Sequence, residues 1–225
     1  MPKVKYPITV QVALEVAYHE AIVRQTYRDS VGVDTWSVGL TSATGHNVKR
    51  YINNPADMQH CINVYVWALD RYADQVRQEF RGHDLTTEQF TAALSFHWNT
   101  GAIRRARWVK SWKAGNVAAA KREIMNWVTP KEITNRRKAE RDLFFDGKWS
   151  NNGTIPEITR LNTRREPIWS SIVSRDITKE VQNAIGVKVV PDHAPKPDRE
   201  FEPTVSNPHT IWTTLLMLWN SFRGN

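Results

Sequence analysis

The hydrophobic pattern predicts a first helix near the N-terminus of the chain. Ile8, Val12 and Val16 recur at helical spacing, and the helix is expected to run to about residue 21. Thr9 precedes the first turn and carries a hydroxyl that can cap it. Glu20 is therefore expected in the last turn, where the negative end of the helix dipole raises the pKa of a carboxyl group.

Turn-forming residues follow this helix and lead into an alternating pattern. Asp29 and Gly32 are typical of a tight turn. Trp36, Val38 and Leu40 then alternate with small or polar residues, as in a short strand. The pattern predicts a hairpin that belongs to a small antiparallel sheet near residues 29–52, with Asp29 facing a cleft.

Helical spacing returns in the second third of the chain and dominates it. Phe90, Leu94 and Trp98 lie four residues apart, and Gly101 is a fitting end for that helix. Further helices are expected after Gly115 and over residues 136–144. The predicted fold class is therefore α+β, mainly helical, with a small antiparallel sheet lobe against a helical lobe.

Residues 150–225 have a different character, and we expect a division into a domain of residues 1–149 and a C-terminal extension. An amphipathic helix is predicted to end at Gly186. Its apolar positions are Val173, Ile177, Val181 and Ile185. Prolines crowd residues 191–208 and mark an extended connector.

An apolar run over residues 210–222 closes the chain. It is too short to span a bilayer. It could fold back on the preceding domain, lie at a membrane surface, or dock in a groove of a larger assembly. Arg223 is the only cation of the terminal segment, which favours protein docking over binding to anionic lipid.

Composition fits a soluble globular protein. The chain has 225 residues, and its one cysteine, Cys61, excludes an intrachain disulfide and is expected in the core. No signal peptide is expected, because Glu15, His19 and Glu20 interrupt the N-terminal apolar segment. The scattered histidines show no zinc-site spacing, and His97 is expected to be packed in the core.

The net charge of +8 lies mostly in the first part of the chain. Residues 1–149 hold 22 Lys and Arg against 15 Asp and Glu. Five cations cluster between Arg104 and Lys113, with Trp108 and Trp112 among them. A basic surface can steer a protein onto a polyanionic bacterial envelope. Binding to nucleic acid is the less favoured alternative, because the tryptophans, four residues apart, can also turn into the core.

Three polar residues at set spacing carry the candidate chemistry. Glu20 is followed after eight residues by Asp29, and Asp29 after five by Thr35. Hydrolysis of a glycosidic bond needs two carboxyl groups on either side of that bond. An acid of raised pKa and a second carboxylate on a hairpin can supply them. An ordinary surface helix followed by a hairpin would produce the same spacing.

The order Glu-x8-Asp-x5-Thr, with Tyr27 before the aspartate, resembles the catalytic segment of phage-type lysozymes. These are the muramidases of glycoside hydrolase family 24, which includes the lysozyme of T-even phages. Three later segments also resemble that family: residues 89–101, residues 112–121, and residues 136–144, which resemble the family's closing helix. The resemblance covers about residues 8–149.

The resemblance implies a peptidoglycan hydrolase that a bacteriophage uses against the wall of its host. Glu20 would be the acid, and Asp29 and Thr35 would orient water or stabilise the transition state. Tyr27, Gly39 and Asn99 would contact the glycan, although Asn99 could equally be a helix cap. No metal or organic cofactor is implied. The protein would work as a lysis endolysin that leaves the host cytoplasm for the periplasm, or at entry as part of the virion, docked through residues 210–222.

Two departures from the family pattern stand near Thr35. Ser37 and Leu40 occupy positions where relatives usually carry glycine and histidine. Ser37 predicts a somewhat different hairpin, because serine resists backbone angles that glycine permits. Leu40 removes a polar neighbour from the expected cleft. A catalytically silent wall-binding or structural protein is therefore an alternative, although the three expected catalytic residues are present.

Overall fold

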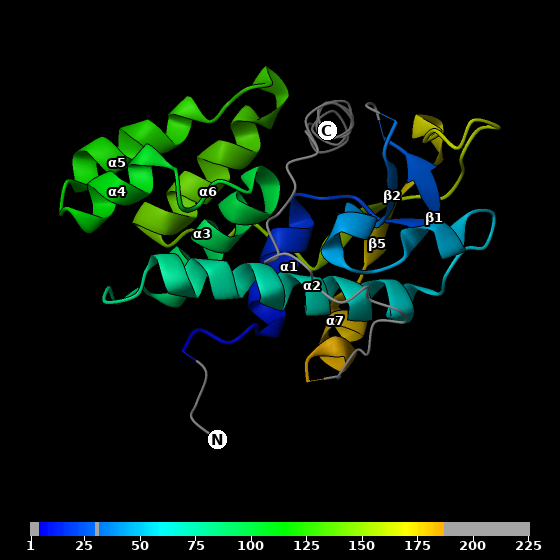
Figure 1. Cartoon of the computed structure of the whole chain (residues 1–225), viewed down its shortest axis with the longest axis horizontal. Coiled ribbons are helices and arrows are strands. Elements are labelled where there is room, and N and C mark those ends of the chain that lie inside the picture. Colours follow the sequence, from blue (N-terminus) through cyan, green and yellow to red (C-terminus); the bar gives the residue numbers. More distant parts are fainter. Residues whose placement is uncertain (1–4, 30–31, 187–225) are drawn as a thin grey trace.

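A computed structural model describes residues 5–29 and 32–186 of the chain, and the structural statements below concern these residues. The proline-rich connector and the terminal apolar run predicted above lie outside them. Helices α3 to α6 gather at one end of the molecule and strands β1, β2 and β5 at the other, with α1 and α2 between (Figure 1). The predicted fold class, α+β and mainly helical, is confirmed.

Helix α1 (Val10–Tyr18) begins as predicted and ends earlier. Thr9 is its N-cap, and the Thr9 hydroxyl accepts a hydrogen bond from the Val12 amide at 3.3 Å. His19 is the C-cap, so Glu20 lies just beyond the helix and not in its last turn. The Glu20 amide still donates to the carbonyl of Ala17 at 2.9 Å, which holds Glu20 against the helix end.

The sheet has three antiparallel strands in the order β1 (Val23–Arg28), β2 (Asp34–Ser37) and β3 (Leu40–Thr41). It starts before residue 29, so the predicted limits were wrong at this end. Trp36 and Leu40 do not share a strand either, since they face each other across the β2–β3 pair. Their alternation with Val38 reflects burial of all three side chains around a tight turn.

Ser37 adopts the conformation that its neighbourhood in the sheet demands. Its φ is +53°, in the left-handed region that favours glycine. The Ser37 hydroxyl donates to the carbonyl of Cys61 at 3.0 Å, and this bond anchors the hairpin to α2. The serine therefore keeps a glycine-like turn at the cost of backbone strain.

Five helices form the body of the molecule. They are α2 (Met58–Glu79), α3 (Thr87–Thr100), α4 (Arg107–Lys113), α5 (Val117–Glu123) and α6 (Thr134–Asp146). Helix α3 confirms the prediction closely: Thr86 and Gln89 form a capping box at its start, and Gly101 ends it with φ +61°. Phe90 and Leu94 are buried at its centre.

The basic segment with interleaved tryptophans turns its rings inward. Trp108 is fully buried and packs edge-on against Phe96 and Phe144. Trp112 meets the ring of Phe80. These rings are occupied by the core, which supports the core-packing interpretation over the stacking of nucleic-acid bases.

Residues 150–186 add a second small sheet and a helix to the fold. Strands β4 (Thr154–Ile158) and β5 (Ile172–Asp176) form an antiparallel pair, and α7 (Thr178–Ala184) follows. The helix predicted over residues 173–185 is therefore wrong in its first half. Residues 173–176 of β5 are all exposed. The apparent helical period arose because apolar residues of the strand and of the following helix happen to lie four positions apart.

The part of the predicted extension that the structure describes shares the core of the preceding residues. Ile155, Ile177 and Val181 are fully buried in the main hydrophobic cluster. Ile22, before β1, forms a parallel bridge with Glu157 of β4. Within residues 5–29 and 32–186, no helix has the length and apolar character needed to cross a membrane.

Glu15 of α1 ties the start of this segment to the first helix. Its buried carboxylate accepts hydrogen bonds from the amides and side chains of Ser150 and Asn151, at 2.5 to 3.2 Å. Burial by itself raises the pKa of Glu15, but the bonds from His19, Ser150 and Asn151 outweigh it and lower the pKa to about 2. The ionised carboxylate thus stabilises this junction.

Candidate active site

Glu20 lies between the last turn of α1 and the first strand, where its carboxyl group meets α6. Its side chain is only 2% exposed. Nη1 of Arg136 donates to Oε1 of Glu20 at 2.6 Å. The chain around residues 19–22 is fixed on both sides, by the helix end and by the bridge from Ile22 to β4. The candidate acid is thus held in a rigid position.

A buried network of ionic groups continues from Arg136 along α6. Nε of Arg136 donates to Glu140 at 2.9 Å, and Glu140 also accepts from Arg137 and, at 2.7 Å, from the hydroxyl of Ser95. Arg137 donates to Oδ1 of Asn99 at 2.7 Å. Arg137 and Glu140 therefore form a buried ion pair on α6, and their further bonds to Asn99 and Ser95 link α6 to α3.

The network gives its two glutamates different protonation behaviour. Burial raises the pKa of Glu20 to about 7, Arg136 opposes the shift, and the charge of Glu140 adds to it. Burial acts on Glu140 in the same direction, but Arg137 and Arg136 together outweigh it and lower its pKa. Glu140 draws on two guanidinium groups, whereas Glu20 shares one. Glu20 can therefore hold a proton near neutral pH, as a general acid must.

Asp29 lies directly after β1, at the start of the turn to β2, as predicted. Its side chain is half-buried, and its carboxylate accepts a hydrogen bond from the Val33 amide at 2.7 Å. Its own amide donates to the carbonyl of Val33 at 3.0 Å. This pair of bonds fixes the orientation of Asp29 on the hairpin.

Tyr27 and Thr35 are direct partners across β1 and β2, so their side chains leave the sheet on the same face. Burial raises the pKa of Tyr27, and the charges of Asp29 and Glu20 raise it further. Both carboxyl groups therefore act on one phenol. Thr35 is 4% exposed, and its hydroxyl donates to the Val33 carbonyl at 3.2 Å. Thr35 thus lies opposite Tyr27 in the sheet, and Asp29 and Glu20 are near enough for their charges to act on the Tyr27 phenol.

The structure gives the surroundings of the three residues that are predicted to contact the glycan. Asn99 is 5% exposed, and its side chain accepts from Arg137, so it belongs to the buried network rather than to a helix cap. Tyr27 is 3% exposed. Gly39 lies in the turn between β2 and β3 with φ +78° and is half-buried. Their contacts with glycan stay predictions.

Sequence reasoning missed Arg136 as the partner of Glu20. The two residues are 116 positions apart, so no spacing could join them. A signal was present within α6, where Arg136, Arg137 and Glu140 continue the helical stripe of Leu143 and Phe144. Charged residues on the apolar side of a helix indicate a buried ionic network.

Other titratable residues have structural roles. His97 is packed as predicted: it is 1% exposed, and its Nε2 lies 3.0 Å from Oε1 of Gln75. Burial, with a smaller effect of Arg104, lowers its pKa to about 3. Cys61 is buried and free. No group of three or more potential metal ligands occurs in the part of the chain that is described.

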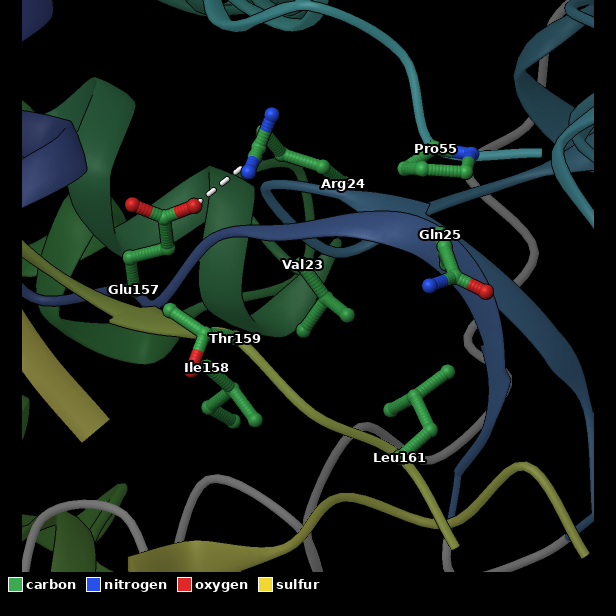
Figure 2. Close-up of a pocket in the computed structure, with 8 residues that line it drawn as sticks. All are labelled: Val23, Arg24, Gln25, Pro55, Glu157, Ile158, Thr159 and Leu161. Atoms are coloured by element: carbon green, nitrogen blue, oxygen red, sulfur yellow. Dashed lines mark hydrogen bonds and ion pairs between the residues drawn. The ribbon is translucent and has the colours of Figure 1, made fainter. Parts of the chain in front are cut away.

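A small polar pocket lies between β1 and the segment that begins with β4. Figure 2 shows that Arg24 and Gln25 line it from β1, while Glu157, Thr159 and Leu161 line it from that segment. Its volume is about 90 Å³. Both oxygens of Glu157 are engaged, by Arg24 and by Arg175 at 2.8 and 2.9 Å. We interpret this pocket as part of the junction between β1 and β4.

Solved structures share this fold at low sequence identity. An endolysin from Escherichia coli O157:H7 phage FAHEc1 is similar with a TM-score of 0.55 and 18% identity, over 66% of this chain and 98% of that one. The muramidase domain of SpmX from Asticaccaulis excentricus gives 0.53 and 19%, over 63% and 99%. A P22 lysozyme mutant gives 0.51 and 19%, over 62% and 99%.

A helical lobe against a small sheet, with an acid of raised pKa between them and a second carboxyl group on the hairpin, defines a glycoside hydrolase of the lysozyme type. The sequence matches the Phage lysozyme family over residues 17–140, more than half of the chain. The chain belongs to this family, whose reaction is the hydrolysis of peptidoglycan. No curated protein sequence matches it.

Proposed function

We propose that this lysozyme cleaves the β-1,4 bond between N-acetylmuramic acid and N-acetylglucosamine, with Glu20 as the general acid. The observation that carries the proposal is the buried Glu20 carboxyl group with a pKa raised to about 7. Such a group is protonated at the onset of the reaction and can give its proton to the glycosidic oxygen as the bond breaks.

Asp29 and Thr35 have complementary roles in this proposal. As the C1–O bond breaks, positive charge develops on the sugar ring, and the Asp29 carboxylate stabilises it. Water held by Asp29 and the Thr35 hydroxyl adds to C1, and its proton passes to the Asp29 carboxylate. Glu20, ionised by the first step, regains a proton from solvent as the Asp29 proton is released. The two carboxyl groups lie in different surroundings, since Glu20 is buried and Asp29 is half-buried on the hairpin.

Arg136 is a positioning residue in this scheme. Its 2.6 Å bond fixes the rotamer of Glu20, and its charge limits how far burial can raise the pKa. A pKa near 7 balances proton retention in the free enzyme against proton donation in the transition state. Arg136 is shared by Glu20 and Glu140, whereas Arg137 pairs with Glu140. In this scheme, that arrangement sets the balance.

The products identify the bond that is cleaved. Purified sacculi are digested with the protein, reduced with borohydride and hydrolysed to free sugars. If the protein cleaves after muramic acid, borohydride reduces the new reducing ends and the hydrolysate contains muramicitol. Glucosaminitol would show cleavage of the other glycosidic bond and would refute the proposed specificity. The absence of new reducing ends would favour a catalytically silent, wall-binding protein.

We further propose that a bacteriophage uses this activity in host lysis, as an endolysin that acts after release from the host cytoplasm to the periplasm. The similarity to a phage endolysin supports this role. Action at entry from within the virion is the alternative, with residues 210–222 as the docking segment. Immunoblots of purified virions separate the two, because an endolysin is left in the lysate and a virion lysozyme bands with the particles.

A further inference from the structure

The segment between β4 and β5 approaches the hairpin that carries Asp29. The amide of Arg28 donates to the carbonyl of Arg165 at 2.8 Å. Nη2 of Arg165 lies 2.9 Å from Oδ1 of Asp34, the strand partner of Arg28. Residues 159–171 therefore border the sheet at the Arg28–Asp34 pair, where β1 leads into Asp29. They lie beyond the residues 17–140 that match the family.

This segment is held in one shape by its own hydrogen bonds. The Asn162 side chain accepts from the amides of Arg164 and Glu166, both at 2.9 Å. Arg165 has φ +63°, a conformation that an arginine adopts only where its surroundings impose it. The backbone of the turn therefore places Arg164 and Arg165 next to each other.

The surface beside this turn is positively charged and concave. A pocket of about 330 Å³ is lined by Arg28, Thr163, Arg164, Arg165 and Glu166. A second pocket, of about 340 Å³, shares Arg28 and includes Asp34 and Lys49. Arg28, the residue before Asp29 in the sequence, thus lines both hollows.

Charge is left over after the internal ion pairs are counted. Arg165 neutralises Asp34, and the Arg164 side chain, 80% exposed, lies 3.3 Å from Glu166. Arg28 and Lys49 are exposed and form no ion pair within the described residues. The paired hollows therefore carry net positive charge and favour an anionic group next to the bound glycan.

We propose that Arg28 and Arg164 form a subsite for carboxylates of the peptides attached to the glycan strand. This inference rests on the proposed function, which places a glycan beside Asp29. Peptidoglycan carries short peptides on its muramic acid residues, and their carboxylates project beside the sugar chain. A guanidinium group suits a carboxylate because it can donate two parallel hydrogen bonds.

The test compares intact sacculi with sacculi from which an amidase has removed the peptides. The double variant Arg28→Ala/Arg164→Ala should raise KM on intact material by about threefold to tenfold and change kcat by less than about twofold. On peptide-free glycan its kinetics should match those of the original protein. Arg122→Ala removes an exposed cation from α5, in the helical lobe, and serves as the control.

Equal losses on both substrates, or no loss on either, would overturn the subsite. Unchanged thermal unfolding of the double variant excludes a folding defect. The variant Arg164→Lys keeps the positive charge and tests whether charge alone is enough to bind the carboxylates. Co-sedimentation of the proteins with both kinds of sacculi measures binding without turnover when each protein also carries Glu20→Gln. It therefore tests the subsite even if the hydrolysis proposal fails, and stronger binding to intact sacculi that depends on Arg28 and Arg164 is the expected result.

Discussion

Glu20 and Arg136 form a 2.6 Å ion pair between the end of α1 and the last helix of the helical lobe. Both side chains are 2% exposed or less. The pair joins the two ends of the family-matched segment and places the candidate acid. It also couples the stability of the fold to the proposed active site, because a charge left alone at this depth is costly.

Loss of Arg136 should therefore destabilise the protein strongly. Arg136→Met leaves Glu20 and part of Glu140 without a counter-ion, and we expect a loss of about 3–5 kcal/mol in the free energy of unfolding. Urea unfolding measures it. Arg141→Met on the same helix is the control: Arg141 is partly exposed and pairs with its neighbour Asp142, so less than about 0.5 kcal/mol is expected. Equal effects of both changes would contradict a structural network.

The pH profile of hydrolysis should report the carboxyl group of Glu20. Its pKa is raised to about 7, and the protonated form is the donor. The kcat/KM on sacculi should therefore be retained below that value and fall as pH rises through about 7. Activity that keeps rising to pH 9 at constant ionic strength would be incompatible with Glu20 as the acid.

Glu15 should make stability sensitive to acid at the junction with residues 150–151. Its pKa is lowered from 4.5 to about 2, so its contribution is fully present above 4.5 and is lost as pH falls toward 2. Glu15→Gln should cost on the order of 2 kcal/mol at pH 7 and reduce the acid sensitivity. Urea unfolding at pH 7 and pH 3 measures both. Parallel pH dependence of the two proteins would show that Glu15 is not the titrating group.

Truncation should separate the folded segment from the rest of the chain. A protein that ends at Gly153 lacks Ile155, Ile177 and Val181, each fully buried, and should fail to fold cooperatively. A protein that ends at Gly186 keeps all of these core residues and should show a cooperative thermal transition and hydrolysis of sacculi. A folded, active protein that ends at Gly153 would contradict the shared core.

Local patterns predicted the first 149 residues better than the rest. Helix α3 has a cap, a period and a glycine stop, and all three were readable in the sequence. Strand β5 and α7 were merged, because Val173 and Ile177 fit a helical period although one belongs to a strand and the other precedes a helix. Periodicity over a short window cannot separate a strand followed by a helix from one amphipathic helix.

The site was predictable only as far as it lies in one stretch of chain. Glu20, Asp29 and Thr35 follow one another, and the spacing points to them directly. Arg136 joins them through tertiary packing, which no local pattern records. The turn at Arg165 was missed for the same reason, since its contact with Asp34 depends on the path of β4 along β1.

The most direct test of the account replaces the candidate acid alone. Glu20→Gln keeps the shape of the side chain and removes its proton donor. We predict a loss of about 100-fold or more in kcat, measured as new reducing ends released from purified sacculi. Glu132→Gln, a half-exposed position in the helical lobe, should keep full activity. A Glu20→Gln protein that releases reducing ends at the original rate would contradict the central claim.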